Sequence, residues 1–188
     1  MIKAAVPKSM VHLALLTSIG VSSVLLAGAH IFEALGYAPC ELCLDQREAH
    51  WTAIGVAMLG LIFSFSAKTK TLASAAVGVV ALIYLLSAVL AGYHTGVEFY
   101  FWPGPSTCGT TGPAVIDGVD LGSALQAGPT GPSCAEALWR FLGISMAGYN
   151  MLISTALFTF CAIAMVHAFR KAKKGRNGLV TKIGSQSE

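Results

Sequence analysis

Charge is what this sequence has least of. Only 11% of its 188 residues are Asp, Glu, Lys or Arg, whereas 55% are hydrophobic. Soluble domains carry about 25% charged residues, and a fold of this size cannot hide so many apolar side chains from water. Disordered chains are rich in charge and poor in bulky apolar residues, so disorder is excluded as well. The composition indicates an integral membrane protein.

Charged residues are missing altogether from four stretches of the chain, namely 9–32, 49–67, 71–97 and 141–169. Each stretch can cross a ~30 Å hydrocarbon core as an α-helix, which takes about 20 residues. In lipid the backbone must pair within its own segment, so these stretches are expected to be helical. The alternating pattern of β-barrel strands is not found. We predict an all-α membrane protein, an antiparallel four-helix transmembrane bundle with spans at approximately 10–34, 49–67, 71–93 and 143–169.

Basic residues are distributed unevenly around these spans. Arg47 and Arg140 lie on one side, and the other ten lie on the opposite side: Lys3, Lys8, Lys68, Lys70, Arg170, Lys171, Lys173, Lys174, Arg176 and Lys182. The positive-inside rule makes the richer side cytoplasmic. Both termini and a tail at 170–188 are therefore expected in the cytoplasm, with loops at approximately 35–48 and 94–142 facing the periplasm. Because topology explains the basic excess, no nucleic-acid partner is expected.

The N-terminus also has features of a secretory signal, since two lysines precede an apolar run that ends in Ala27-Gly28-Ala29. This run is longer than the 7–15-residue core of such signals. Its removal would also place the two termini on opposite sides of the membrane. We therefore expect the first span to be retained.

The long outer loop contains five of the seven prolines, which predicts an irregular segment. Its few apolar residues, Val115, Ile116, Val119 and Leu125, are compatible with a short helix on the membrane surface or with a loop that carries scattered apolar side chains. Residues 175–188 are expected to form a loose tail.

Four of the five cysteines fall in the two outward loops. Cys40 and Cys43 form a C-x-x-C pair, and Cys108 and Cys134 lie on the long loop, where they can pair with each other or reach elsewhere. Cys161 lies in the middle of the fourth span and is interpreted as a small buried hydrophobe. Thiols on the outer face of a bacterial inner membrane meet an oxidising compartment. A disulfide across two residues in a tight turn opens and closes readily, so the pattern predicts redox exchange.

Other functions of a C-x-x-C pair are less consistent with the sequence. A c-type haem site needs His directly after the second cysteine, where this chain has Leu44. A four-cysteine zinc site usually has two C-x-x-C knuckles, and Cys108 and Cys134 do not form the second one. Two structural disulfides would explain the even number of outer cysteines, but not a pair held against the membrane.

Three segments together resemble the DsbB family, disulfide bond formation protein B. They are Pro39-Cys40-Glu41-Leu42-Cys43-Leu44-Asp45-Gln46-Arg47, Tyr93-His94-Thr95, and Ser133-Cys134-Ala135-Glu136 followed by Trp139-Arg140-Phe141-Leu142-Gly143. The resemblance covers all four spans and both loops. The related VKOR group has a different cysteine order and span count.

The resemblance implies an inner-membrane enzyme that takes electrons from a periplasmic DsbA-type thioredoxin-fold dithiol oxidase and passes them to a membrane quinone. A disulfide-forming protein needs a two-electron acceptor, and the chain has no dinucleotide fingerprint and no haem motif. Either ubiquinone or menaquinone is compatible with the sequence. By the same resemblance, the partner attacks a Cys108–Cys134 disulfide at Cys108, Cys134 then attacks Cys40, and Cys43 donates to the quinone.

Three further residues are predicted to bind the quinone. Arg47 is close enough to Cys43 in sequence to lower the pKa of its thiol and to donate a hydrogen bond to a quinone carbonyl, although it can also be an interfacial anchor. His94 is a second contact or a proton source, although a histidine at the edge of a loop can also be merely solvated. Met146 lines the pocket by resemblance, and ordinary helix packing is its alternative role. The alternative function is a membrane metal-binding or carrier protein that uses Cys40, Cys43 and the two loop cysteines as ligands.

Overall fold

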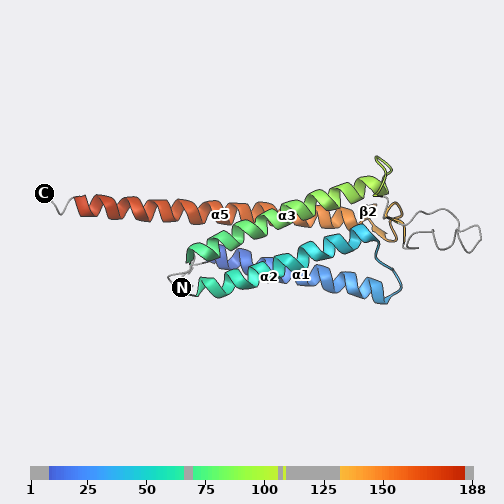
Figure 1. Ribbon diagram of the computed structural model, residues 1–188, viewed down its shortest axis with the longest axis horizontal. Coiled ribbons are helices and arrows are strands. Elements are labelled where there is room, and N and C mark those ends of the chain that lie inside the picture. Colours follow the sequence, from blue (N-terminus) through green and yellow to red (C-terminus); the bar gives the residue numbers. More distant parts are fainter. Residues whose placement is uncertain (1–8, 66–69, 106–107, 109–131, 185–188) are drawn as a thin grey trace, which may run out of the picture.

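The computed structural model describes residues 9–65, 70–105, 108 and 132–184. In this part of the chain, four α-helices and one short hairpin follow one another: α1 (Ser9–Ala34), α2 (Glu41–Ser64), α3 (Lys70–Glu98), β1 (Arg140–Phe141), β2 (Ile144–Ser145) and α5 (Met146–Gly184). Consecutive helices run in opposite directions, so the start of α1 and the end of α5 lie toward one end of the bundle (Figure 1). The α1–α2 connection and the hairpin lie at the other end. The predicted all-α architecture is confirmed, and the apolar residues between 115 and 125 lie outside the described residues.

Three of the helices are long and apolar enough to cross a membrane: Met10–Ala34 in α1, Thr71–Glu98 in α3 and Met146–Arg170 in α5. Helix α2 is as long as a span, but its first two turns contain Asp45, Arg47 and Glu48. The charge-free part of α2 runs only from Ala49 to Ser64. The charged residues before it lower the mean hydropathy of the helix. The second span, at 49–67, therefore stays a prediction.

At the end of the bundle that holds the α1–α2 connection and the hairpin, the helices differ from the predicted spans. Helix α2 begins at Glu41 because the Cys40 sulfur caps it, accepting a hydrogen bond from the Cys43 N–H at 3.3 Å. Helix α3 continues to Glu98, so that His94 and Glu98 lie on it and not in a loop. Before α5, the chain forms a hairpin in which Phe141 pairs with Ile144. Its two turn residues, Leu142 and Gly143, both have positive φ, as a type I′ turn requires.

The expectation of a loose tail at 175–188 is wrong for most of this segment, because α5 continues to Gly184. The helix extends well beyond the other three at this end (Figure 1). Residues 170–174 are Arg, Lys and Ala, which favour helix, and no proline follows to stop it. Helix propensity thus accounts for the extension through Lys174. Gly175, Asn177 and Gly178 follow, which do not favour helix, and nothing in the sequence accounts for the last turns of α5.

Small side chains fill much of the centre of the bundle around a few larger ones, such as Leu15, Tyr84 and Leu157, and large apolar side chains cover its outside. The buried core includes Ala14, Ala53, Ala57, Val77, Val80, Ala81 and Tyr84. A Cβ atom on Gly60 would come within 2.7 Å of the Ala76 Cβ, so α2 and α3 approach closely there. Outside, leucines, valines and isoleucines are exposed, with Val24 at 71% and Leu86 at 68%. Helices that are apolar on every face belong in lipid, in agreement with a multi-pass membrane protein.

Candidate active site

The cysteines gather at the end of the bundle where α2 begins, α3 ends and the hairpin leads into α5 (Figure 1). Cys40 precedes α2, Cys43 lies in its first turn, and Cys134 lies on the segment before β1. Two of these residues are almost completely buried, with Cys40 at 5% and Cys134 at 1% exposure. The site is therefore enclosed by protein and not displayed on a free loop.

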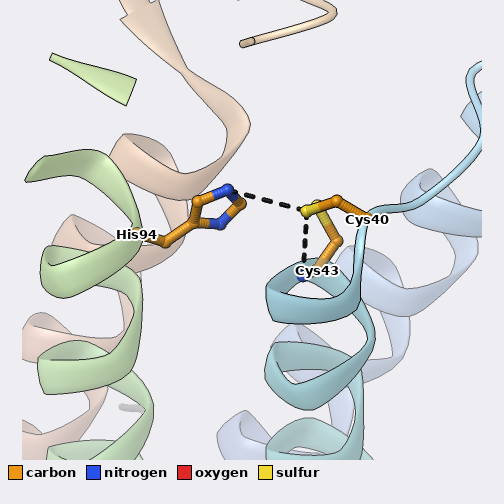
Figure 2. A group of neighbouring side chains, drawn as sticks. All are labelled: Cys40, Cys43 and His94. Carbon is orange, nitrogen blue, oxygen red and sulfur yellow. Dashed lines mark hydrogen bonds between the residues drawn. The ribbon is translucent and has the colours of Figure 1, made fainter. Parts of the chain in front are cut away.

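Cys40 and Cys43 form a thiol pair at the N-terminus of α2. Their sulfur atoms are 2.6 Å apart, and neither is bonded to another cysteine (Figure 2). The hydrogen bond from the Cys40 thiol lowers the pKa of Cys43, whereas burial opposes this shift. Unpaired backbone N–H groups in the first turn of a helix also favour a thiolate. Cys43 is therefore the better nucleophile of the two.

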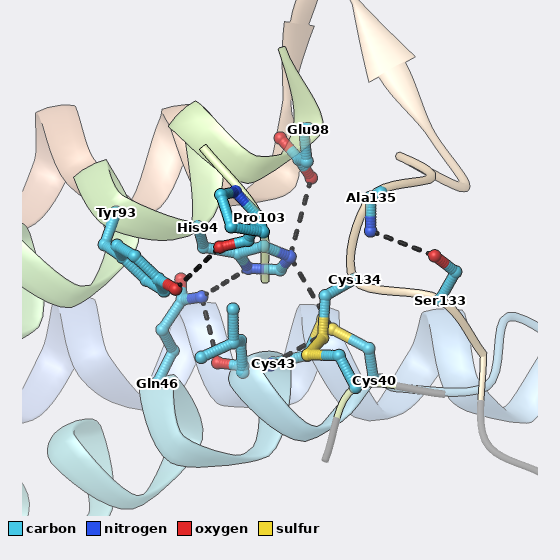
Figure 3. Close-up of a disulfide and its surroundings, with 12 residues drawn as sticks. Cys40, Cys43, Gln46, Tyr93, His94, Glu98, Pro103, Ser133, Cys134 and Ala135 are labelled. Atoms are coloured by element: carbon cyan, nitrogen blue, oxygen red, sulfur yellow. Dashed lines mark hydrogen bonds and ion pairs between the residues drawn. A yellow bond between two sulfur atoms is a disulfide. The ribbon is translucent and has the colours of Figure 1, made fainter. Parts of the chain in front are cut away.

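Cys108 and Cys134 form a disulfide with a Cα–Cα distance of 5.6 Å. The sequence spacing left this pairing open. The disulfide packs into the same small apolar cluster as Cys40, Cys43, Leu42 and Val97, and Cys134 lies directly against the Cys40–Cys43 pair (Figure 3). The structure therefore brings together the four cysteines that the sequence distributes over two distant loops.

His94 points from α3 into this group and is 3% exposed. Its Nε2 atom lies 3.6 Å from the Cys40 sulfur and 3.9 Å from Glu98 Oε1, and its Nδ1 atom lies 2.8 Å from the side-chain nitrogen of Gln46 (Figure 3). Glu98 is also buried and accepts a hydrogen bond from the Ser145 hydroxyl. Two polar side chains of α3 thus border the thiol pair.

The structure changes the ligand set of the metal-binding alternative. The sulfur atoms of Cys108 and Cys134 are bonded to each other, so they do not join Cys40 and Cys43 as free ligands. Among the described residues, the donor atoms of Cys40, Cys43 and His94 lie within 4.8 Å of one another (Figure 2). Two thiolates and an imidazole suit Zn²⁺, which binds sulfur and nitrogen ligands.

Arg47 has its direct contacts with α1 and not with the thiols. Its guanidinium forms an ion pair with Glu33 at 2.5 Å and donates to the Ala29 carbonyl at 3.2 Å. Its charge still contributes to lowering the pKa of Cys43, as the weakest of the contributing causes. Arg47 therefore links α1 to α2 beside the site and keeps further N–H donors, since a guanidinium has five.

A cavity of about 470 Å³ opens next to the thiol pair. Cys40, Cys43, Arg47, His94 and Met146 line it, so the structure brings every predicted site residue to this cavity except Cys108 and Cys134, which form the disulfide beside it. Most of the remaining wall is apolar, and it includes the rings of Phe32 and Trp139, whose centroids are 5.3 Å apart. Small-molecule sites are typically concave and apolar, with a few convergent polar groups.

Five polar residues at this site were not predicted: Glu33, Gln46, His50, Glu98 and Asn150. All of them line the cavity except Glu33, which pairs with Arg47. For four of the five, the sequence contained a feature that indicates a functional residue. Glu33, Glu98, His50 and Asn150 are polar residues in or directly beside charge-free stretches, where a polar side chain usually has a function.

A bundle of long apolar helices with a C-x-x-C thiol pair packed against a disulfide defines a membrane protein of thiol–disulfide exchange. The chain belongs to the family described as Disulfide bond formation protein DsbB, whose model matches residues 11–164. Family membership supports a disulfide-forming oxidoreductase in the membrane.

The chain is also similar to individual proteins, two of which below carry the name of this family. The chain is 30% identical over 138 residues to the Disulfide bond formation protein B of Xylella fastidiosa (strain 9a5c), which covers 70% of this chain and 72% of that protein. It is 26% identical over 140 residues to the protein of the same name from Aromatoleum aromaticum, covering 74% and 81%. A protein named RP370 from Rickettsia prowazekii is 26% identical over 155 residues, covering 81% and 86%.

Proposed function

We propose that this protein is a thiol:quinone oxidoreductase of the bacterial inner membrane. It reoxidises a periplasmic DsbA-type dithiol oxidase and passes the electrons to a membrane quinone, which supports disulfide formation in periplasmic proteins. One observation carries the proposal: two cysteine pairs share a buried cluster, and one of them lines an apolar cavity. A path for electrons from a protein thiol to a lipid-soluble acceptor needs both features.

The reaction starts from the oxidised form, in which Cys40 and Cys43 are joined by a disulfide, whereas the structure has them as free thiols. The first steps then transfer the disulfide from this pair. The thiolate of the partner attacks Cys108, so a mixed disulfide forms and the Cys108–Cys134 bond breaks. Cys134 leaves as a thiolate and attacks Cys40, forming a Cys134–Cys40 bond as the Cys40–Cys43 bond breaks and Cys43 leaves. The burial of Cys40 and Cys134 in the same cluster supports this order. The lowered pKa of Cys43 supports its role as leaving group, since low-pKa thiols leave faster.

The remaining exchange steps release the partner. Its second thiolate displaces Cys108, which leaves the partner with a disulfide. Cys108 then attacks Cys134, so the Cys108–Cys134 bond forms again and Cys40 leaves as a thiolate. Two electrons now reside on the Cys40–Cys43 pair, beside the cavity. The pair returns to a disulfide by giving up these two electrons and two thiol protons.

The residues around the cavity fit a quinone. When bound, a quinone accepts two electrons and two protons, which balances the oxidation of two thiols. Cys43 provides the nucleophile at the cavity wall, and the apolar residues around it suit a ring with a lipid tail. Arg47 can donate a hydrogen bond to a carbonyl oxygen, His94 is a second polar contact or a proton source at the cavity, and Met146 contributes to the wall. Ubiquinone and menaquinone are both compatible with this lining.

The direct test is an assay with the purified full-length protein, a reduced DsbA-type protein and a soluble quinone analogue. We expect quinone-dependent oxidation of the partner, with one quinone reduced for each disulfide formed. Thiol titration before and after oxidation with quinone distinguishes the metal-binding alternative. An oxidoreductase ends with two disulfides, whereas a metal protein keeps thiols that become reactive only after a chelator is added.

Replacing Arg47 by Ala is expected to raise the KM for quinone tenfold or more, because the loss of a hydrogen bond from a charged donor costs about 1.5–3 kcal/mol. Exchange between the partner and Cys108 should stay nearly unchanged. Glu33→Gln is the matched control, since it removes the ion pair and leaves the guanidinium in place. If Glu33→Gln raises KM as much as Arg47→Ala, Arg47 acts only by joining α1 to α2.

The orientation in the membrane is tested with a reporter that is active only in the periplasm. Fusions after Lys70 or Lys174 should be silent, because basic residues are retained in the cytoplasm. A fusion near Gly122 should be active. Activity after Lys70 would place the α2–α3 connection outside and would contradict four spans.

A further inference from the structure

A line of buried and half-buried polar side chains runs from the thiol pair into the core of the bundle, and the steps above use only its first member, His94. It begins at His94 on α3 and continues through Gln46 on α2, Asn150 on α5 and His50 on α2. Gln46 and His50 are buried, at 6% and 4% exposure. Polar groups are costly in such surroundings unless they are hydrogen-bonded, and each of these residues has partners on both sides.

One backbone carbonyl determines the orientation of the Gln46 amide. The Gln46 side-chain nitrogen lies 3.0 Å from the Leu42 carbonyl oxygen, which can only accept. This end of the amide must therefore be the NH₂ group. The same nitrogen lies 2.8 Å from His94 Nδ1 and donates its second hydrogen there. Because Nδ1 accepts a hydrogen bond, the neutral ring of His94 carries its proton on Nε2.

The surroundings of His94 Nε2 are consistent with this tautomer. Its neighbours are the Cys40 sulfur at 3.6 Å and a carboxylate oxygen of Glu98 at 3.9 Å, both of which can accept. The ring also forms a hydrogen bond with the backbone of Cys134, beside these two groups. A ring with the proton on Nδ1 would instead face the Gln46 NH₂ group with a donor. His94 therefore directs an N–H group at Cys40.

Asn150 and His50 extend the same order of donors and acceptors. The Asn150 nitrogen donates to Gln46 Oε1 at 2.8 Å, which leaves the Asn150 oxygen to accept from His50 Nε2 at 2.8 Å. Ser154 donates to the same oxygen at 3.1 Å. On its other side, His50 Nδ1 is 2.9 Å from the Ser22 hydroxyl, which can serve as donor. Every hydrogen in the line thus points from His50 toward the thiols.

We infer that Gln46, Asn150 and His50 form an orienting relay that fixes the tautomer of His94 and directs its Nε2–H group at the Cys40 sulfur. They are positioning residues, because they act on the thiol through His94. Hydrogen bonds that point in one direction along a chain polarise one another, so the relay also strengthens the final donor. Its role in the reaction rests on the proposed function: Cys40 leaves as a thiolate when Cys108 attacks Cys134, and an N–H donor stabilises that charge.

The experiment reads the tautomer directly, by ¹⁵N NMR of the purified full-length protein labelled at histidine, with a His94→Gln sample to assign the signals. In the unmodified protein we expect a bare Nδ1 and a protonated Nε2 on His94. Gln46→Glu replaces the NH₂ group by an acceptor and should protonate Nδ1. Asn150→Asp, which touches neither His94 nor the thiols, should shift the same signal in the same direction, because it removes the donor to Gln46 Oε1. Ser154→Ala is the matched control and should leave the signal unchanged.

A second measurement connects the relay to the thiol. In a Cys43→Ala background at fixed pH, Gln46→Glu should lower the alkylation rate of Cys40 about tenfold, which corresponds to ~1.4 kcal/mol less stabilisation of the thiolate. The neutral variant Gln46→Leu should lower the alkylation rate of Cys40 less, because the His94 ring can still adopt either tautomer. This variant keeps the test valid if Gln46→Glu folds poorly.

A protonated Nδ1 in the unmodified protein, or a bare Nδ1 in Gln46→Glu, would overturn the relay even if quinone-dependent turnover is normal. Unchanged alkylation of Cys40 in Gln46→Glu, with the tautomer inverted, would overturn its role at the thiol. Conversely, the expected tautomers in a protein without quinone-dependent turnover would support the relay and contradict the proposed function.

Discussion

A Cys134→Ala variant is expected to accumulate a covalent complex with the DsbA-type partner and to lose turnover entirely. Without Cys134, Cys108 is a free thiol, since the structure pairs these two residues. Its thiolate attacks the disulfide of the oxidised partner, so a mixed disulfide forms and one partner thiol is released. No resolving thiolate follows on this chain, because the normal one is Cys134. The complex should appear on a non-reducing gel and disappear on reduction.

Cys108→Ala is the matched control, because it removes the other half of the same disulfide. Its remaining thiol, Cys134, is 1% exposed and packed against Cys40, so it is hidden from a soluble partner. We expect little or no complex in this variant. A complex that forms equally well in Cys108→Ala would reverse the assigned order of attack, and turnover in Cys134→Ala would exclude the disulfide as the partner's target.

A Cys43→Ala variant is expected to lose quinone reduction to the background rate. Cys43 lines the cavity, lies in the first turn of α2 and has the lowered pKa of the thiol pair. Its removal leaves Cys40 with no partner to close the disulfide that electron transfer must regenerate. Reduction of a quinone analogue is followed by absorbance, and exchange with the partner is followed separately by gel. The variant should still oxidise one equivalent of the partner, because this exchange needs only the Cys108–Cys134 disulfide.

Cys161→Ala is the control for the loss of a buried thiol. Cys161 lies in the core of the bundle, 3.6 Å from the Ser18 hydroxyl and among the apolar residues that include Tyr84 and Leu157. Alanine keeps most of this packing, so activity should be retained. Loss of turnover in Cys161→Ala together with quinone reduction by Cys43→Ala would contradict the electron path.

Much of the fold could be predicted because lipid imposes simple requirements on a sequence. Long stretches without charge must be helical where the backbone has no water to bond with, and this predicted α1, α3 and α5. The ends of the elements were less predictable. Helix α2 begins eight residues before its charge-free stretch because the sulfur of Cys40 caps it. Helix α5 continues to Gly184, beyond the helix-favouring residues 170–174, through a segment whose glycines and β-branched residues do not predict helix.

The candidate site was also predictable in part. The types of its reactive residues were readable from the sequence, because a C-x-x-C pair and two further outward cysteines carry their chemistry wherever they are placed. Their arrangement was not readable, since it depends on contacts between residues far apart in the chain. Nothing in the local sequence pairs Arg47 with Glu33, or Asn150 with Gln46.

Composition and hydrophobic pattern therefore determined that this chain is a helical membrane protein, and they predicted redox exchange at the four cysteines outside its spans, because both inferences follow from local chemistry. The packing of α2, α3 and α5 decided which cysteine meets which, where the cavity lies beside Cys43, and which nitrogen of His94 faces the thiols. Hydrogen bonds and sulfur contacts act over only a few ångströms, so residues distant in sequence acquire these relations only when the helices assemble.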